Sequence, residues 1–336
     1  MGDPSGVGPE TITAAWKTCL AEGLCRPMVV GHPEVMRQAV SLLGTGAEVV
    51  EITAPEEAQP TTDVIPCLAV GRDEVLNAPP AAVDPRSGEA AFEAICLATE
   101  LALVGRVDAV TTAPISKVAL QQAGHNYPGH TELLAELCGV DDFAMMLYLR
   151  DTDLGVVHVT LHTALRDVAE LITTEAVRQK IDLAQAAIER LSDFTSPPRI
   201  GVCALNPHAG EEGLFGDEEQ TKIRPAVEQA IADGVNVTGP LPADTLMVAA
   251  HQGEYDVVVA MYHDQGHIAL KLLGMHRAVN VTLGLPIIRT SVAHGTAFDV
   301  AWQGRAEASG MVEAIRVASQ LAGRHRTCKA ATSGRA

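Results

Sequence analysis

Three histidines lie where short apolar runs, typical of buried β-strands, come to an end. They are His162, His208 and His263. In an open α/β sheet, ligands bind beyond the carboxyl ends of the strands. Three neutral imidazoles that meet there form a site with open positions, as a catalytic divalent metal requires. The alternative is that each histidine makes only a local hydrogen bond.

Glycines dominate the first segment of the chain, residues 2–10 (GDPSGVGPE). They permit a tight turn, and Pro9 suits the first position of a helix. Such a turn presents free backbone N–H groups to an anion. No G-x-G-x-x-G fingerprint occurs, so a standard dinucleotide-binding turn is not supported. The alternative is an ordinary helix entry.

Other candidates for anion binding are a helix start and two cations. His130 and Thr131 (PGHTE, 128–132) are expected at a helix N-terminus, where backbone dipoles favour phosphate or carboxylate. The alternative there is a simple N-cap. Lys271 and Arg289 lie in apolar surroundings, so each is expected to face an anionic partner or ligand. The alternative for both is a structural salt bridge.

Short apolar segments alternate with amphipathic ones along the chain, which predicts an α/β fold with a largely parallel sheet core. Strands are expected over residues 28–31, 107–112, 143–149, 155–161, 199–205 and 256–261. Helices are expected over 33–43, 88–104, 131–137, 174–191, 217–232 and 310–321, with Ser87 and Thr131 as N-caps of the second and third.

The composition excludes several classes of protein. The 336 residues carry 42 acids against 24 bases, a net charge of −18, which argues against a nucleic-acid binder and against binding to an acidic membrane surface. The seven cysteines are odd in number and form no C-x-x-C pair, as expected of reduced thiols. Without an apolar span or a signal peptide, the expected location is the cytoplasm.

Long motifs in a fixed order then point to a family. They are GDPSGVGPE (2–10), PGHTE (128–132), LHTALRD (161–167), NPHAGEEGLFGDEE (206–219), GPLPADT (239–245), MYHDQGH (261–267) and GLPIIRTSVAHGTAFDVA (284–301). With them the chain resembles the 4-hydroxythreonine-4-phosphate dehydrogenase (PdxA) family over almost its whole length. The first and last motifs are also similar to the wider isocitrate and isopropylmalate dehydrogenase superfamily.

The resemblance implies a two-lobed fold with the active site in the cleft between the lobes. Residues 1–122 and 277–336 would form a discontinuous cofactor-binding lobe, and residues 123–276 a lobe for metal, substrate and dimerisation. It also implies a homodimer whose active site is shared between the subunits.

The resemblance also assigns roles to residues. A divalent metal, with zinc expected and magnesium, manganese or cobalt as alternatives, matches His162, His208 and His263, drawn from both subunits. Substrate contacts match His130, Thr131, Lys271, Asn280 and Arg289. NAD or NADP matches the loop with His294, Gly295, Thr296 and Asp299. Candidate catalytic residues are Asp244, Asp264 and Lys117.

The implied reaction is metal-assisted oxidation of a 4-phosphorylated 3-hydroxy acid by NAD(P), followed by decarboxylation, as in pyridoxal phosphate biosynthesis. Segments 123–130, 213–219 and 294–302 look closer to a paralogous branch that acts on D-threonate or D-erythronate 4-phosphate. Less favoured alternatives are a metal-dependent hydrolase, a phosphoacyl transferase of related fold, and a non-catalytic binding protein.

Members of this family usually carry about ten residues before the GDP turn, which form a buried first strand. Met1 already stands at that turn here. We therefore expect either a start assigned at an internal methionine or a lobe that lacks this strand, and we expect an extended N-terminus to stabilise the lobe.

Overall fold

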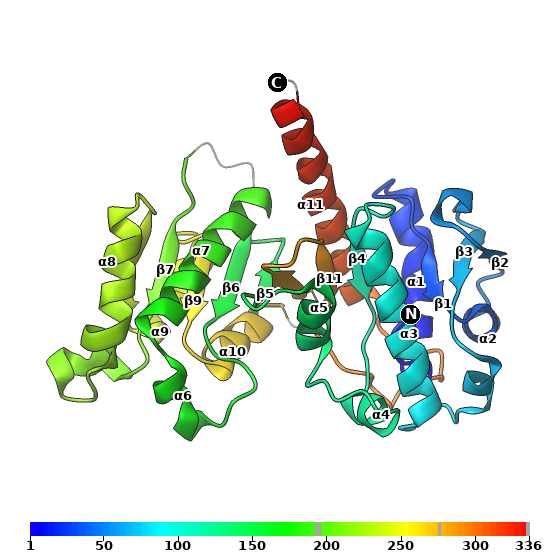
Figure 1. Cartoon of the computed structure of the whole chain (residues 1–336), viewed down its shortest axis with the longest axis horizontal. Helices are drawn as coiled ribbons and strands as arrows, with labels where there is room; N and C mark the ends of the chain where they lie inside the picture. The colour runs from blue at the N-terminus through cyan, green and yellow to red at the C-terminus, as the bar shows by residue number, and fades with distance from the viewer. Residues whose placement is uncertain (192–195, 275–276, 334–336) are drawn as a thin grey trace. The chain divides into compact units, whose positions relative to one another are not determined.

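The computed structural model describes residues 1–191, 196–274 and 277–333, with side chains up to residue 323. The chain forms two compact units (Figure 1). Unit 1 contains Met1–Asp141 and Leu285–Ala336, and unit 2 contains Asp142–Gly284.

The change from unit 1 to unit 2 comes later in the chain than the expected lobe boundaries, 122/123 and 276/277. Helix α5 (His130–Cys138) accounts for the first difference, because Leu133 and Leu134 are buried in the same cluster as Ile95 and Leu120 of unit 1. The second expected boundary falls next to residues 275–276, which are outside the description.

Unit 1 is built from two sets of parallel strands and their helices. Its first part contains α1 (Gly8–Ala21), β1 (Val29–Gly31), α2 (Pro33–Leu43), β2 (Glu48–Ile52), β3 (Val64–Ala69), α3 (Pro85–Leu103), β4 (Val110–Thr112), α4 (Lys117–Gln122) and α5. Its last part contains β11 (Arg289–Val292) and α11 (Ser309–Ser333). One sheet has the order β1-β3-β2, and β4 pairs in parallel with β11.

A cavity of about 790 Å³ lies within unit 1. Residues of β1 and of β4 both line it, together with apolar side chains that include Trp16, Met28 and Met311. The cavity therefore lies beside the edge of the three-stranded sheet and beside the β4–β11 pair.

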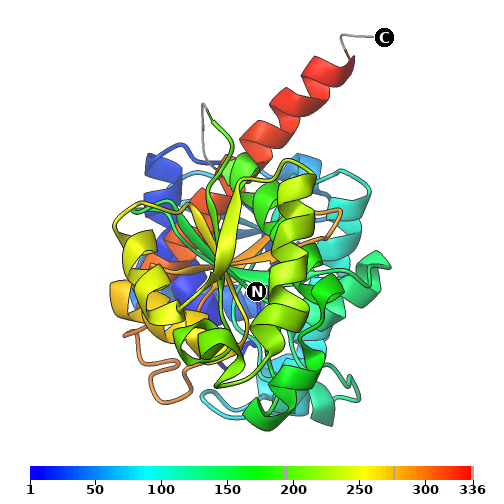
Figure 2. The same cartoon turned by 90° about the vertical axis from the view of Figure 1, so that its left-hand side faces the viewer.

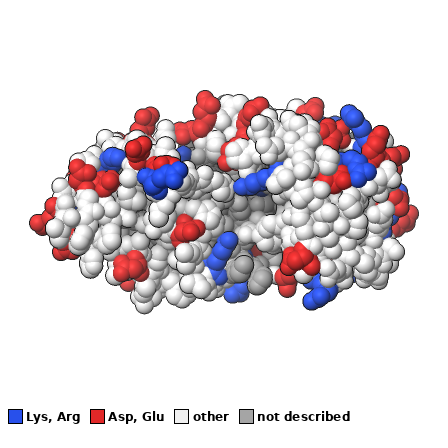
Figure 3. Space-filling view, turned by 90° about the horizontal axis from the view of Figure 1, so that it is seen from below, with Lys and Arg blue, Asp and Glu red and all other residues white. Residues whose placement is uncertain are grey.

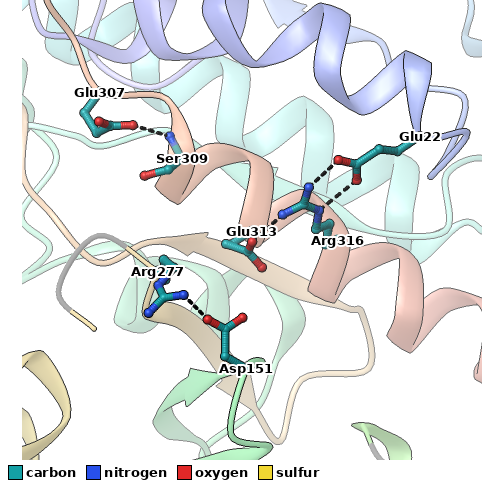
Figure 4. Close-up of polar contacts among 7 residues, drawn as sticks. All are labelled: Glu22, Asp151, Arg277, Glu307, Ser309, Glu313 and Arg316. Atoms are coloured by element: carbon teal, nitrogen blue, oxygen red, sulfur yellow. Dashed lines mark hydrogen bonds and ion pairs between the residues drawn. The ribbon is translucent and has the colours of Figure 1, made fainter. Parts of the chain in front are cut away.

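Helix α11 is fastened to the rest of unit 1 by charge as well as by apolar packing. Met311 and Val312 are buried with Ala15 and Cys19 of α1. The guanidinium of Arg316 donates hydrogen bonds to Glu22, which follows α1, and to Glu313 (Figure 4). Burial of the apolar face supplies most of the stability, since partly exposed ion pairs contribute little.

Unit 2 is a single sheet with helices on both sides. Its elements are β5 (Ala144–Leu149), β6 (Leu154–His158), α6 (Leu165–Leu171), α7 (Thr174–Leu191), β7 (Ile200–Cys203), α8 (Arg224–Ala232), β8 (Val237–Leu241), α9 (Ala243–His251), β9 (Val257–Ala260), α10 (His263–Gly274) and β10 (Val279–Leu283).

The strand order in unit 2 is β10-β5-β6-β9-β7-β8. Strands β6, β9, β7 and β8 pair in parallel, while β5 pairs antiparallel with both β6 and β10. Figure 2 looks toward this unit, with α8 on one side of the strands and α9 on the other. Because both faces are covered, the strands β5, β6, β7 and β9 are buried along their whole length.

The α/β class and the parallel core predicted from the sequence are confirmed, with corrections at element ends. The helix expected over 88–104 is α3, and it begins at Pro85. The Asp84 carboxylate accepts a hydrogen bond from Arg86 N, so Asp84 and not Ser87 is the N-cap of this helix. Helix α5 has Gly129 as its N-cap, which places Thr131 inside the first turn. Residues 219–223 form a π-helical turn, so the helix expected over 217–232 is regular only from Arg224.

Charges of both signs mix on one face of the molecule (Figure 3), and the described cysteines are unpaired. On the face shown in Figure 3, Lys and Arg side chains lie scattered among Asp and Glu side chains. Six cysteines are free thiols, and the side chain of Cys328 lies outside the described part. None of the helices in the described ranges is long and apolar enough to cross a membrane.

Gly88 provides a test of the packing between α3 and α4. A Cβ at this position would lie 2.2 Å from the carbonyl oxygen of Ala119. Gly88→Ala gains about 1 kcal/mol of helix propensity, but we expect a net loss of about 3 kcal/mol in the free energy of unfolding because the backbones must separate. Urea denaturation measures the change.

Gly323→Ala is the matched control, because nothing lies within 4 Å of a Cβ at that helical position. It should leave stability unchanged or raise it by up to about 1 kcal/mol. A Gly88→Ala protein as stable as the wild type would contradict the close approach of α3 and α4.

Candidate functional site

The carboxyl ends of three neighbouring parallel strands form one edge of the sheet in unit 2. Strands β6, β9 and β7 lie side by side in that order. They end at His158, Ala260 and Cys203, one to three residues before the ends expected from the sequence. The segments that carry His162, His263 and His208 therefore all leave the sheet at the same edge.

His162 and His263 lie close to each other at this edge. Their ring centroids are 5.9 Å apart. His263 is the first residue of α10, and its Nδ1 lies 2.6 Å from Oδ1 of Asp264. A carboxylate that accepts from Nδ1–H leaves Nε2 as the lone-pair nitrogen, which is the arrangement that a metal ligand needs.

His208 lies in a separate turn after β7. Its side chain is 75% exposed, with Nδ1 3.7 Å from Glu211 and the ring near Phe215. Within the described residues of this single chain, no cluster of three or more His, Cys, Asp and Glu side chains is arranged to hold a metal ion. The predicted set draws its histidines from both subunits, so it stays a prediction.

The turn that carries His208 is held by Glu219. This glutamate is buried, and its Oε1 accepts backbone hydrogen bonds from Leu205 N (2.8 Å) and Asn206 N (2.7 Å). Its Oε2 accepts a third from the side-chain amide of Asn206 at 3.1 Å. His208 itself has a φ of +55°, a backbone conformation that needs such support.

Sequence reasoning missed two histidines that lie beneath His263. The ring of His267 stacks on His263 with centroids 3.7 Å apart, and its Nδ1 lies 3.1 Å from Nε2 of His158. Burial lowers the pKa of His158 to about 3 and that of His267 to about 4, so both are neutral at physiological pH. The i,i+4 spacing of His263 and His267 in MYHDQGH was the available signal.

The remaining candidates of unit 2 lie on β10 and on two helices. Asn280 on β10 has a buried Oδ1 without a hydrogen-bond partner, while its Nδ2 lies 3.2 Å from Met145 Sδ. Lys271 is half-buried on α10. Asp244 is exposed in the first turn of α9, and its Oδ1 accepts a hydrogen bond from Thr245 N. The unsatisfied amide oxygen makes Asn280 the strongest of these as a ligand contact.

Unit 1 contributes a buried cation. Arg289, the first residue of β11, is 1% exposed, and its Nη2 donates to Thr112 Oγ1 at 2.8 Å. Burial lowers the pKa of its guanidinium to about 9, and the charge of Glu132 opposes that shift. Because the group stays cationic at neutral pH, an anion placed against it would be strongly stabilised.

His130 lies within the electrostatic reach of this cation. Its Nε2 is buried and has no hydrogen-bond partner. Burial, followed by the charges of Arg289 and Lys117, holds its pKa well below the usual value, so the ring is neutral and one of its nitrogens can donate a hydrogen bond to an anion. Thr131, next to it, is buried in the first turn of α5, and Lys117 begins α4.

The segment with His294, Gly295, Thr296 and Asp299 forms a loop after β11. His294 and Asp299 are exposed, and Thr296 O accepts a hydrogen bond from Val7 N at 3.0 Å. A Cβ on Gly6 would come within 3.0 Å of Thr296, so the glycine allows the two segments to touch. The loop and the GDPSGVGPE turn are thus packed against each other within unit 1.

Asp3 is a buried carboxyl in that turn. Its Oδ1 accepts a hydrogen bond from Ser5 N at 2.9 Å, while its Oδ2 is buried without a partner. Burial raises the pKa of Asp3 from 3.8 to about 6. The charged form is therefore disfavoured in the folded protein.

The raised pKa of Asp3 predicts how stability depends on pH. Because the folded state holds this proton more tightly than the unfolded state, the associated stability is present below about pH 4 and lost as the pH rises through 6. The shift of about 2 pKa units corresponds to about 3 kcal/mol at most. As the pH rises from 4 to 8, the free energy of unfolding of Asp3→Asn should therefore increase by up to about 3 kcal/mol relative to that of the wild type. Urea denaturation at the two pH values measures this change.

Exposed Asp141→Asn serves as the control and should track the wild type at both pH values. A constant difference between wild type and Asp3→Asn across this range would contradict a buried carboxyl at Asp3.

Comparison with known proteins identifies the family of the chain. A family model described as "Pyridoxal phosphate biosynthetic protein PdxA" matches residues 23–318. A D-threonate 4-phosphate dehydrogenase of Pectobacterium atrosepticum is 47% identical and covers 96% of this chain and 98% of the relative. A 4-hydroxythreonine-4-phosphate dehydrogenase of Geobacter metallireducens is also 47% identical, covering 96% and 94%.

The fold agrees with that of a solved relative. The crystal structure of a 4-hydroxythreonine-4-phosphate dehydrogenase from Klebsiella pneumoniae superposes with a TM-score of 0.86 at 44% identity, covering 96% of this chain and 98% of that one. The chain therefore belongs to the PdxA family of dehydrogenases.

Proposed function

We propose that the protein oxidises 4-hydroxythreonine 4-phosphate, a 4-phosphorylated 3-hydroxy acid, with NAD(P) and a divalent metal, and that the product loses CO2. The buried guanidinium of Arg289 carries this proposal, because it is a cation withdrawn from water in a chain of net charge −18. An anionic ligand placed against such a group would be strongly stabilised, and relatives of this chain are named for phosphorylated acids.

The residues of unit 1 suit the phosphate. Arg289 offers planar N–H donors, and the neutral ring of His130 offers one more beside it. Thr131 adds a hydroxyl at the start of α5, where the helix dipole favours an anion. Lys117 adds charge near His130, and we assign it a role in holding substrate or moving a proton.

His162, His208 and His263 would hold the metal. In support, His162 and His263 approach each other within one chain, and Asp264 fixes the tautomer of His263. Three neutral imidazoles suit zinc best, with magnesium, manganese and cobalt as alternatives. When bound, a divalent cation lowers the pKa of an alcohol, and a nicotinamide ring accepts hydride.

The other polar residues of unit 2 would orient the substrate. The unsatisfied Oδ1 of Asn280 accepts a hydroxyl or ammonium proton, and Lys271 attracts the carboxylate. The exposed carboxylates of Asp264 and Asp244 suit proton transfer. The loop with His294, Gly295, Thr296 and Asp299 would hold the nucleotide, which makes unit 1 the cofactor lobe.

A homodimer with a shared active site is part of the proposal. Helix α10, which begins at His263, exposes Ile268 (59%) and Leu272 (82%) one turn apart on one face. Large apolar side chains of this kind at the surface favour a protein contact, and a second copy would cover them. It would also bring a second set of histidines to the site. We place the protein in the cytoplasm.

D-threonate 4-phosphate is the second candidate substrate. A relative named for that substrate is as identical to this chain as one named for 4-hydroxythreonine 4-phosphate. The two substrates differ at C2, where one carries a hydroxyl and the other an amine.

A direct comparison tests the substrate. The purified protein is supplied with NAD+ or NADP+, zinc or manganese, and each of three phosphates: 4-hydroxythreonine, D-threonate and D-erythronate 4-phosphate. We expect kcat/KM for 4-hydroxythreonine 4-phosphate to exceed that for the others at least about tenfold, which corresponds to about 1.4 kcal/mol of transition-state binding. Higher kcat/KM for D-threonate 4-phosphate would favour the second candidate, and no nicotinamide reduction with any of them would exclude both.

The metal assignment is tested with His208→Ala. We expect this variant to lose bound zinc in equilibrium dialysis and to lose activity at least about a thousandfold, because a three-histidine site loses one ligand. Its fold should persist, since the His208 side chain is 75% exposed.

His251→Ala provides the control, because His251 is an exposed histidine at the end of α9. It should bind zinc and turn over like the wild type. Full turnover by a zinc-free His208→Ala protein would overturn the assignment.

A further inference from the structure

Glu10 closes the GDPSGVGPE motif, and none of the roles assigned above uses it. Its side chain is fully buried. Each carboxylate oxygen accepts one backbone hydrogen bond from the segment after the proposed nucleotide loop: Oε2 from Trp302 N, and Oε1 from Gly304 N at 2.8 Å. The carboxylate therefore joins α1 to a segment almost 300 residues later in the chain.

Two further contacts connect the same segments. The indole Nε1 of Trp302 donates to Pro4 O at 2.9 Å, and Val7 N donates to Thr296 O at 3.0 Å. The loop is thus attached to the turn at Thr296, at Trp302 and at Gly304. Glu10 supplies two of the four hydrogen bonds.

The loop backbone is strained between these attachments. Ala297 has a φ of +45° and Trp302 a φ of +60°, in the left-handed region that residues with a side chain rarely adopt. Such conformations persist only when surrounding contacts impose them, and they are common at ligand-binding segments. At Trp302, the imposing contact is the bond from its backbone N–H to Glu10.

We propose that Glu10 is a positioning residue that holds residues 294–304 in the conformation that binds the nucleotide. This inference rests on the proposed nucleotide site at His294–Asp299. A loop released from Glu10 relaxes into other conformations, and the apparent affinity for the nucleotide falls by the fraction of molecules that keep the binding conformation. Glu10 does not touch the nucleotide, so saturating nucleotide should restore turnover.

Glu10→Gln is a sharp test because of the hydrogen-bond geometry. Both oxygens of Glu10 accept from a backbone N–H, so in either orientation of a glutamine its NH2 group faces another donor. Glu219→Gln is the matched control in unit 2. Its two backbone bonds both end on Oε1, so a glutamine there keeps them and loses only the contact with the Asn206 amide.

The experiment titrates NAD+ and NADP+ calorimetrically into the full-length wild type, Glu10→Gln and Glu219→Gln. We expect Glu10→Gln to bind the preferred nucleotide at least about tenfold more weakly, which corresponds to about 1.4 kcal/mol. The kcat at saturating nucleotide should stay within about twofold of wild type, and amide exchange should accelerate at residues 294–304. Glu219→Gln should bind the nucleotide within about twofold of wild type.

Two outcomes overturn the role of Glu10: unchanged nucleotide affinity in Glu10→Gln, or an equal loss in both variants. If Glu10→Gln does not fold, Trp302→Phe replaces it, because this variant removes the indole donor to Pro4 O and keeps an aromatic ring against Val35, Val75 and Ala90. We expect a loss of affinity of about threefold, and unchanged affinity overturns the proposal.

Asp299→Ala separates this inference from the nucleotide assignment. Asp299 is exposed, so its removal leaves the loop attachments intact. Weaker nucleotide binding in Asp299→Ala together with an unaffected Glu10→Gln rejects the positioning role alone. Unchanged binding in Asp299→Ala rejects the nucleotide site at this loop, and with it the role of Glu10.

Discussion

The burial of the Arg289 guanidinium is the constraint on which the chemistry of unit 1 depends. The side chain is 1% exposed, and it is held at the start of β11 by the parallel pairing of that strand with β4. Withdrawing a full charge from water costs several kcal/mol, and the hydrogen bond to Thr112 and the charge of Glu132 offset part of that cost. The neighbouring His130 stays neutral because it shares that environment. A site of this kind is prepared for an anion, whatever the net charge of the chain.

Buried glutamates hold the two loops that carry the proposed functional residues. Glu219 accepts the backbone N–H groups that lead into the His208 turn, and Glu10 accepts those that follow the loop of Thr296. In both places neighbouring residues have a positive φ, so the loops keep conformations that an isolated chain would avoid. A carboxylate suits this task because it only accepts hydrogen bonds, and two oxygens can satisfy several backbone donors.

Much of the architecture was accessible from the sequence. The alternation of apolar and amphipathic segments predicted the α/β class, and the runs before the three histidines correctly indicated parallel neighbouring strands. The strands over 48–52 and 64–69 and the helix over 263–274 were not predicted. The β2 segment is largely exposed and the N-terminal half of α10 is polar, so neither shows a clear apolar period. The sequence also did not show that α5, which reads as an independent helix, is buried against α3 in unit 1.

The sequence by itself determined the fold class, the family and the types of residue available for chemistry, because periodicity, charge and motifs are properties of neighbouring residues. Tertiary structure alone decided which of these residues meet. It brought His267 against His158, withdrew Arg289 and Asp3 from water, and joined Glu10 to Gly304. Burial and long-range backbone contacts set these pKa values and conformations, and both depend on segments that are hundreds of residues apart in the chain.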